Sequence, residues 1–174
     1  STKLEEELKQ IRDDFGQEDN IFDENMIQIY ENPTIDTVEL NDISFKDDVI
    51  SEKFNNLTNI QKFILLNSKL SNICNAPQNL THLILNKRNL SIVDCAILSP
   101  TIKLLNLSHN KIILITNINP NIEELILDSN ELEYISDLPP IKRISIKSNK
   151  IKDVSMFKYG TSELDLNNNC IEDI

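Results

Sequence analysis

Apolar and polar residues follow one recurring pattern of eleven positions along most of this chain. Apolar side chains occupy the first, fourth, sixth and last positions, and the ninth is usually asparagine. Successive side chains of a strand point to opposite faces, so the alternation around the fourth and sixth positions predicts a short strand in each copy. The pattern occurs seven times, at residues 35–45, 60–70, 80–90, 102–112, 122–132, 141–151 and 161–171.

The spacing between copies limits what joins them. Measured at the sixth position, successive copies are 25, 20, 22, 20, 19 and 20 residues apart. The pattern itself uses eleven residues, which leaves about nine for the return path. A helical turn rises about 5.4 Å, so nine residues are too few for a two-turn helix and its connections. We therefore expect extended or 3₁₀ return segments, with room for a short helix only at residues 47–54 in the longest step.

The pattern resembles the leucine-rich repeat, L-x-x-L-x-L-x-x-N-x-L at a period of 20 to 29 residues. The resemblance covers about four fifths of the chain, residues 35–174. It implies an α/β solenoid, a right-handed horseshoe with a parallel concave sheet and a mostly extended or 3₁₀ convex side. Proline stands two residues before four of the copies, which partly resembles the bacterial-effector type of this repeat. These residues are Pro33, Pro100, Pro120 and Pro139.

The asparagines at the ninth position are expected to form a structural ladder. Each would point inward and bond backbone groups of neighbouring turns that are otherwise unsatisfied. The ladder residues are Asn110, Asn130, Asn149 and Asn169. Ser68 and Arg88 interrupt the ladder in the second and third copies, and we expect Arg88 to swing outward, with Asn89 or a water molecule in its place.

Residues 1–34 differ from the repeats in both charge and periodicity. They hold ten acidic and three basic residues, which is −7 of the total net charge of −11. Leu4, Leu8, Ile11 and Phe15 recur at helical spacing, and a second apolar group follows at residues 21–30. The first turn of a solenoid exposes its core unless a cap covers it, so an acidic helical N-terminal cap is expected. A helix that binds a partner is the alternative.

At the other end, the sequence stops three residues after the last copy. We expect either a C-terminal continuation or a partner that covers the last repeat.

The charge balance and the cysteines restrict the classes of partner and compartment. Seventeen basic residues stand against 28 acidic ones, which argues against nucleic acid and against an anionic membrane surface. No apolar run is long enough to predict membrane insertion. Cys74, Cys95 and Cys170 are scattered, which is typical of reduced thiols. An intracellular, cytoplasmic location is expected, and the host cytoplasm if the chain is an effector.

Residues for chemistry are scarce. His82 and His109 stand in adjacent copies at different positions of the pattern, and no ligand spacing beside them resembles a metal site. Gly16 and Gly160 are the only glycines, so a Gly-rich phosphate loop is excluded. We therefore predict no enzymatic activity, no cofactor and no metal.

A binding surface is predicted on the solvent-facing side of the parallel sheet. The third, fifth and seventh positions of the copies point outward there, and we call this surface the sheet face. From the second to the fifth copy it carries aliphatic residues, and contiguous exposed patches of this kind often mark interfaces. The predicted partner-binding residues are Lys62, Ile64, Leu66, His82, Ile84, Leu104, Asn106 and Ile126. The alternative is that β-branched residues only suit strands.

The last three copies carry charges at the same outward positions. The parallel stacking predicts rows in which Glu124, Arg143 and Glu163, and likewise Asp128 and Lys147, pair across strands.

The sequence thus predicts a non-enzymatic protein-interaction scaffold that binds a protein on its concave sheet. Two alternatives stay open. The chain is the substrate-recognition or regulatory arm of a larger enzyme, such as an effector ubiquitin ligase or a phosphatase regulator, or it is a structural component of an assembly.

Overall fold

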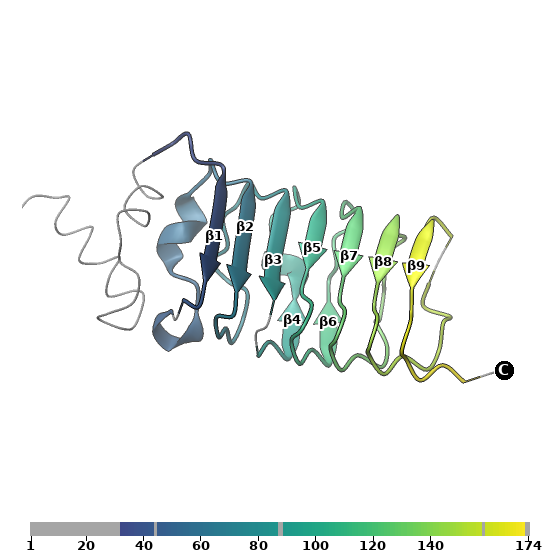
Figure 1. The fold of residues 1–174 in the computed structure, drawn as a ribbon. Helices are drawn as coiled ribbons and strands as arrows, with labels where there is room; N and C mark the ends of the chain where they lie inside the picture. Colours follow the sequence, from purple (N-terminus) through teal and green to yellow (C-terminus); the bar gives the residue numbers. More distant parts are fainter. Residues whose placement is uncertain (1–31, 44, 87–88, 158, 173–174) are drawn as a thin grey trace, which may run out of the picture.

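The computed structural model describes residues 32–43, 45–86, 89–157 and 159–172, and they form one row of stacked coils (Figure 1). Each copy of the pattern contributes one strand to a seven-stranded parallel sheet, in the order β1-β2-β3-β5-β7-β8-β9. The strands are β1 (Thr37–Asn41), β2 (Lys62–Leu66), β3 (His82–Asn86), β5 (Leu104–Asn106), β7 (Glu124–Ile126), β8 (Arg143–Ser145) and β9 (Glu163–Asp165). The predicted parallel-sheet solenoid is confirmed.

The register follows the repeat without a slip. Ile64 of β2 lies opposite Ile84 of β3, and Leu104 of β5 lies opposite Glu124 of β7. Equal positions of the pattern therefore meet across every pair of neighbouring strands in the sheet. A slip of one residue would turn each apolar set outward, so the buried positions hold the register in place.

The return path is built from extended segments and 3₁₀ turns, as expected. The 3₁₀ helices are η1 (Lys46–Asp48), η2 (Glu52–Asn56) and η3 (Cys95–Ile97). In the longest step, two 3₁₀ helices replace the single short helix that the spacing allowed. The sequence did not predict a second sheet, in which β4 (Ile92–Asp94) pairs in parallel with β6 (Leu114–Thr116).

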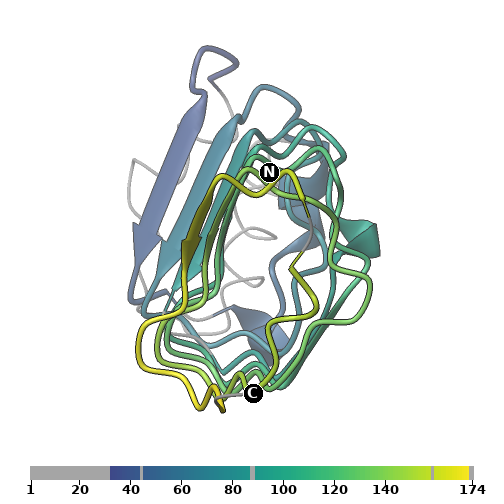
Figure 2. The same ribbon diagram turned by 90° about the vertical axis from the view of Figure 1, so that its right-hand side faces the viewer.

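The view along the stack shows the sheet on one side of each coil and the return path on the other (Figure 2), and the buried hydrophobic side chains form one core cluster. The first, fourth, sixth and last positions of the pattern contribute to it together with residues of the return path, and Leu105, Leu107, Leu125 and Leu127 are fully buried. In the first coils, Phe54 of η2 lies between Phe45 and Phe63, with ring centroids 6.0 and 5.3 Å from its own. The three rings fill the interior of the larger coil that the 25-residue step creates.

A left-handed bend recurs one residue before the ladder position. Its residue has φ between 55° and 58° in six copies, a conformation that costs energy for side chains other than glycine. Short polar side chains and one histidine occupy it. The residues are Asp42, Asn67, His109, Ser129, Ser148 and Asn168.

Burial changes in the last coil. Leu164 is 42 % exposed, whereas Leu125 and Ile144 at the same position of earlier copies are at most 3 % exposed. Ile171 is 44 % exposed, whereas Ile151 is fully buried. Whether further repeats or a partner cover these side chains stays a prediction.

Two other expectations concern residues outside those described, namely the helical N-terminal cap up to residue 31 and the outward swing of Arg88. The right-handed twist and the horseshoe curvature also stay predictions.

Candidate functional site

The asparagine ladder joins successive coils through buried side-chain amides. Asn130 Nδ2 donates to the carbonyl oxygens of Leu107 and Leu127, each at 3.0 Å, while its Oδ1 accepts the N–H of Ile112 at 3.0 Å. Asn110, Asn149 and Asn169 make equivalent bonds to their own turn and to the turn before. Each amide thus satisfies backbone groups of two coils at once.

Serine takes the place of asparagine in the second copy. The buried Ser68 Oγ accepts the N–H of Ile43 at 3.0 Å, so one bond to the preceding coil is kept. On the neighbouring strand, the Oδ1 atom of Asn86 is buried without a hydrogen-bond partner. Among the described residues, the complete set of ladder bonds, with both amide donors and the acceptor engaged, first occurs at Asn110.

Five aliphatic side chains lie at nearby positions of the sheet face. We call this group the aliphatic cluster, and its members are Ile64, Leu66, Ile84, Leu104 and Ile126. Ile64 lies opposite Ile84 in register, and Leu104 lies diagonally between Ile84 and Ile126 on neighbouring strands. All five are half-buried rather than exposed. They therefore present apolar side chains on β2, β3, β5 and β7, although Asn106 stands between Ile84 and Ile126 in the row, and part of each side chain is already covered in the free chain.

The three polar residues predicted for the sheet face have different surroundings. Lys62 is exposed at the edge of the cluster. His82 is half-buried, and its Nδ1 lies 2.9 Å from Thr81 Oγ1. Asn106 interrupts the aliphatic row, but its Oδ1 accepts the N–H of Ser108 at 3.0 Å. Asn106 therefore has a structural role in the turn after β5, which the sequence did not reveal.

Charged residues on β7 and β8, and just after these two strands, pair with one another across neighbouring coils. Arg143 lies 3.5 Å from Glu124, and Lys147 Nζ lies 3.8 Å from Asp128. Asp128 Oδ1 also accepts the hydroxyl of Ser145 at 2.6 Å and the N–H of Lys147 at 2.9 Å. The cations of this half of the sheet face are thus engaged within the solenoid.

A second group of apolar side chains lies on the opposite, return side and was missed from the sequence. We call it the return-side cluster: Ile92, Ile113, Leu114 and Tyr134, each between 43 % and 61 % exposed. Ile92 and Leu114 lie opposite each other in the β4–β6 pair. The signal was present, because residues 92, 114 and 134 each stand two positions after the last apolar residue of a copy.

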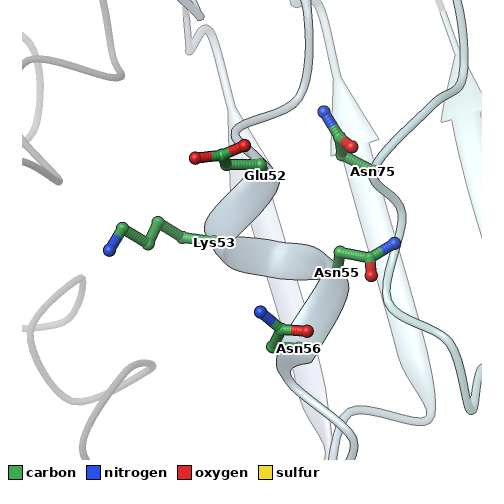
Figure 3. A pocket seen from close by; sticks show the side chains of 5 residues that line it. All are labelled: Glu52, Lys53, Asn55, Asn56 and Asn75. Atoms are coloured by element: carbon green, nitrogen blue, oxygen red, sulfur yellow. The ribbon is translucent and has the colours of Figure 1, made fainter.

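The described surface has open hollows, and the one beside η2 is lined by polar side chains. One of about 450 Å³ lies beside η2 and is lined by Glu52, Lys53, Asn55, Asn56 and Asn75. Figure 3 shows that these side chains do not converge, since Lys53 extends away from Asn55 and Asn75. Asn75 Nδ2 instead donates to the carbonyl of Ile50 at 2.9 Å.

Two kinds of feature, a metal-ligand cluster and a membrane-spanning helix, are absent from residues 32–43, 45–86, 89–157 and 159–172. Within them, no three histidine, cysteine, aspartate or glutamate side chains gather closely enough to hold a metal ion. Over the same ranges, no helix has the length and apolarity that crossing a bilayer requires.

The three cysteines are unpaired and differ in accessibility: Cys95 is buried, Cys74 half-buried and Cys170 exposed. Burial raises the pKa of the Cys95 thiol to about 12, and the negative charge of neighbouring Asp94 adds to the effect. The thiolate is the reactive form, so Cys95 is protected both sterically and electrostatically.

Thiol labelling of the folded chain is therefore expected to follow accessibility. At about pH 8, an iodoacetamide probe should modify Cys170 first and Cys74 more slowly, while Cys95 holds roughly one thiolate in ten thousand molecules and stays unmodified. Peptide mass spectrometry over time measures this order. Cys95 should react only after denaturant is added, and labelling of native Cys95 as fast as Cys170 would contradict the structure.

Comparisons with known proteins agree with the coil geometry. No family model and no curated protein matches the sequence. Among solved structures, YopM from Yersinia enterocolitica WA-314 matches with a TM-score of 0.57 and 25 % identity, over 64 % of this chain and 25 % of YopM. The matched part thus spans about a quarter of the length of YopM, a bacterial effector built from leucine-rich repeats.

Proposed function

We propose that this chain, a leucine-rich repeat solenoid, is a non-enzymatic scaffold that holds a protein partner on its sheet face. The observation that carries the proposal is the aliphatic cluster, whose five side chains occupy neighbouring outward positions on four successive strands. The fold supports a broad surface rather than an enclosed pocket. Such surfaces bind proteins through a central apolar group surrounded by polar residues.

The energetics favour binding at this cluster over an incidental strand preference. Fully burying a leucine or isoleucine side chain stabilises a complex by about 1.5–3 kcal/mol. The cluster residues are half-buried in the free chain, so each retains roughly 1 kcal/mol of that gain for a partner. Lys62, exposed at one side, and the pairs Arg143–Glu124 and Lys147–Asp128 at the other supply a polar rim.

We extend the proposal to the setting in which the scaffold works. The three unpaired cysteines support a reducing, intracellular compartment, and the host cytoplasm if the chain acts as an effector as YopM does. The acidic net charge of −11 supports a protein partner over nucleic acid.

Replacing Ile84 and Leu104 together by aspartate is expected to abolish capture of the partner from a lysate of the source cells. Each charge would be desolvated against an apolar partner surface without a counter-charge. Both side chains are half-buried on the outward side of the sheet and outside the core, so circular dichroism and melting should change little. The measurement is a pull-down with the wild-type and variant chains, compared by quantitative mass spectrometry.

The return-side cluster provides the matched control. Ile113→Asp with Leu114→Asp places the same charges on two apolar residues of the opposite side, where both are exposed. This variant should capture the partner normally. Retained capture by the Ile84→Asp/Leu104→Asp chain, or loss only in the control, would refute binding on the sheet face.

A further inference from the structure

The charges of the sheet face divide unevenly among its last three strands. Arg143 of β8 pairs with Glu124 of β7, and Lys147, two residues after β8, pairs with Asp128, two residues after β7. Glu163 and Asp165 of β9 have no such counterpart, because within the described ranges no lysine, arginine or histidine pairs with either carboxylate. Asp165 Oδ1 accepts the N–H of Asn167 at 3.1 Å, and Glu163 is exposed.

A hollow of about 220 Å³ opens between these groups on the sheet face. Arg143 and Ser145 line one side of it, and Glu163 and Asp165 line the other. Arg143 lies opposite Glu163 in register, but its guanidinium contacts Glu124 on the other neighbouring strand. The β9 side of the hollow thus keeps two carboxylates that form no ion pair with a basic side chain of the described residues.

The carboxylates lie at a fixed distance from the aliphatic cluster. Ile126 of β7 and Asp165 of β9 hold the same position of the pattern and are separated by two strand steps. Strands are about 4.8 Å apart, so the carboxylate lies about 10 Å beyond the end of the cluster. This distance equals about three residues of an extended peptide or six to seven residues of a helix.

We propose that the sheet face recognises a cationic amphipathic segment of its protein partner. Aliphatic or aromatic side chains of the segment contact Ile84, Leu104 and Ile126, and a lysine or arginine about 10 Å farther along contacts Glu163 and Asp165. This inference rests on the proposed function of the sheet face. It adds the chemistry of the partner segment and its direction. The apolar part of the segment lies over β3, β5 and β7, and its basic residue lies over β9.

Charge complementarity supports this occupant. An acidic segment would place like charges against Glu163 and Asp165, which disfavours binding, whereas a cation gains attraction there and from the net charge of −11. The apolar cluster supplies affinity and the carboxylates supply selectivity among apolar segments.

The test selects peptides of about twelve residues from a random display library on the full chain and measures the affinity of enriched peptides by fluorescence anisotropy. Enriched peptides should pair an apolar stretch with Lys or Arg. Glu163→Gln with Asp165→Asn should weaken their binding about three- to tenfold and flatten its dependence on salt. Glu131→Gln with Glu133→Gln, an equal change of charge at exposed positions off the sheet face, should leave their affinity unchanged.

The Ile84→Asp/Leu104→Asp chain separates the two levels of the proposal. If this chain loses the peptides but Glu163→Gln/Asp165→Asn binds them as tightly as wild type, the cationic segment is refuted and the sheet face stands. Enrichment of acidic or uncharged apolar peptides refutes the cationic segment in the same way. If the aspartate pair leaves binding intact, the proposed function fails together with the inference.

Discussion

Replacing Asn130 by alanine is expected to lower the free energy of unfolding by about 3 kcal/mol. The N–H of Ile112 would lose its acceptor inside the core, and a buried unsatisfied donor costs about 1–3 kcal/mol. The carbonyls of Leu107 and Leu127 would each lose one of two amide donors, because Asn110 and Asn149 also donate to them. Most of the expected loss of stability therefore comes from the Ile112 N–H, because both carbonyls keep one amide donor. Urea unfolding followed by circular dichroism measures it.

Two variants test the physical reason for this loss. Asn121→Ala removes an exposed asparagine and should change stability by less than about 0.5 kcal/mol. Asn130→Asp keeps the acceptor for Ile112 but sets a carboxylate beside two carbonyls, which raises the pKa of the new acid above its unfolded value. Its stability should therefore decrease as the pH rises above about 4. An Asn130→Ala chain as stable as wild type would show that the ladder bonds contribute nothing net.

Replacing Phe54 by alanine is expected to cost about 3–5 kcal/mol, the usual range for a fully buried phenylalanine. Phe54 projects from η2 between Phe45 and Phe63, so its removal breaks two ring contacts and leaves a cavity in the largest coil. The loss of stability should appear in urea unfolding. Hydrogen exchange should rise most in β1, β2 and η2, because each coil of a solenoid contacts mainly its neighbours.

Tyr159→Ala is the matched control, since this aromatic ring is fully exposed. Its stability should stay within about 0.5 kcal/mol of wild type. Equal losses for the two aromatic substitutions, or faster exchange spread evenly over β1 to β9, would contradict the assignment of Phe54 to a local core.

The sequence predicted the strands well because two constraints agree at each copy. The alternation of apolar and polar positions fixes which side chains turn inward, and the repeat spacing fixes which strands meet. Ile64 and Ile84 could be paired in advance for this reason. The inward asparagines could also be predicted, since a stack of turns leaves backbone N–H and C=O groups unpaired unless an inward polar side chain bonds them.

Other features depend on atoms that a pattern does not locate. The Leu107 carbonyl accepts hydrogen bonds from both Asn110 and Asn130. This sharing depends on the distance between successive coils, which the spacing of residues in the sequence does not give. The hydrogen bond from the Ser108 N–H to Asn106 Oδ1 gives Asn106 a structural role that the pattern did not indicate, and its role toward a partner stays a prediction. The β4–β6 sheet forms where two neighbouring return segments are both extended. Their extended conformation depends on local φ and ψ angles, which the repeat pattern does not specify.

The left-handed bends before the ladder have an evolutionary consequence. Six of them occur in a chain with two glycines, so asparagine, aspartate, serine and histidine carry conformations that glycine adopts without strain. Short polar residues adopt this φ at lower cost than a valine or isoleucine, which would strain the backbone between two coils. Substitution at these corners is therefore restricted by backbone conformation, and at Asn67 and Asn168 also by side-chain hydrogen bonds to the neighbouring coil, whereas the outward strand positions carry no such backbone restriction.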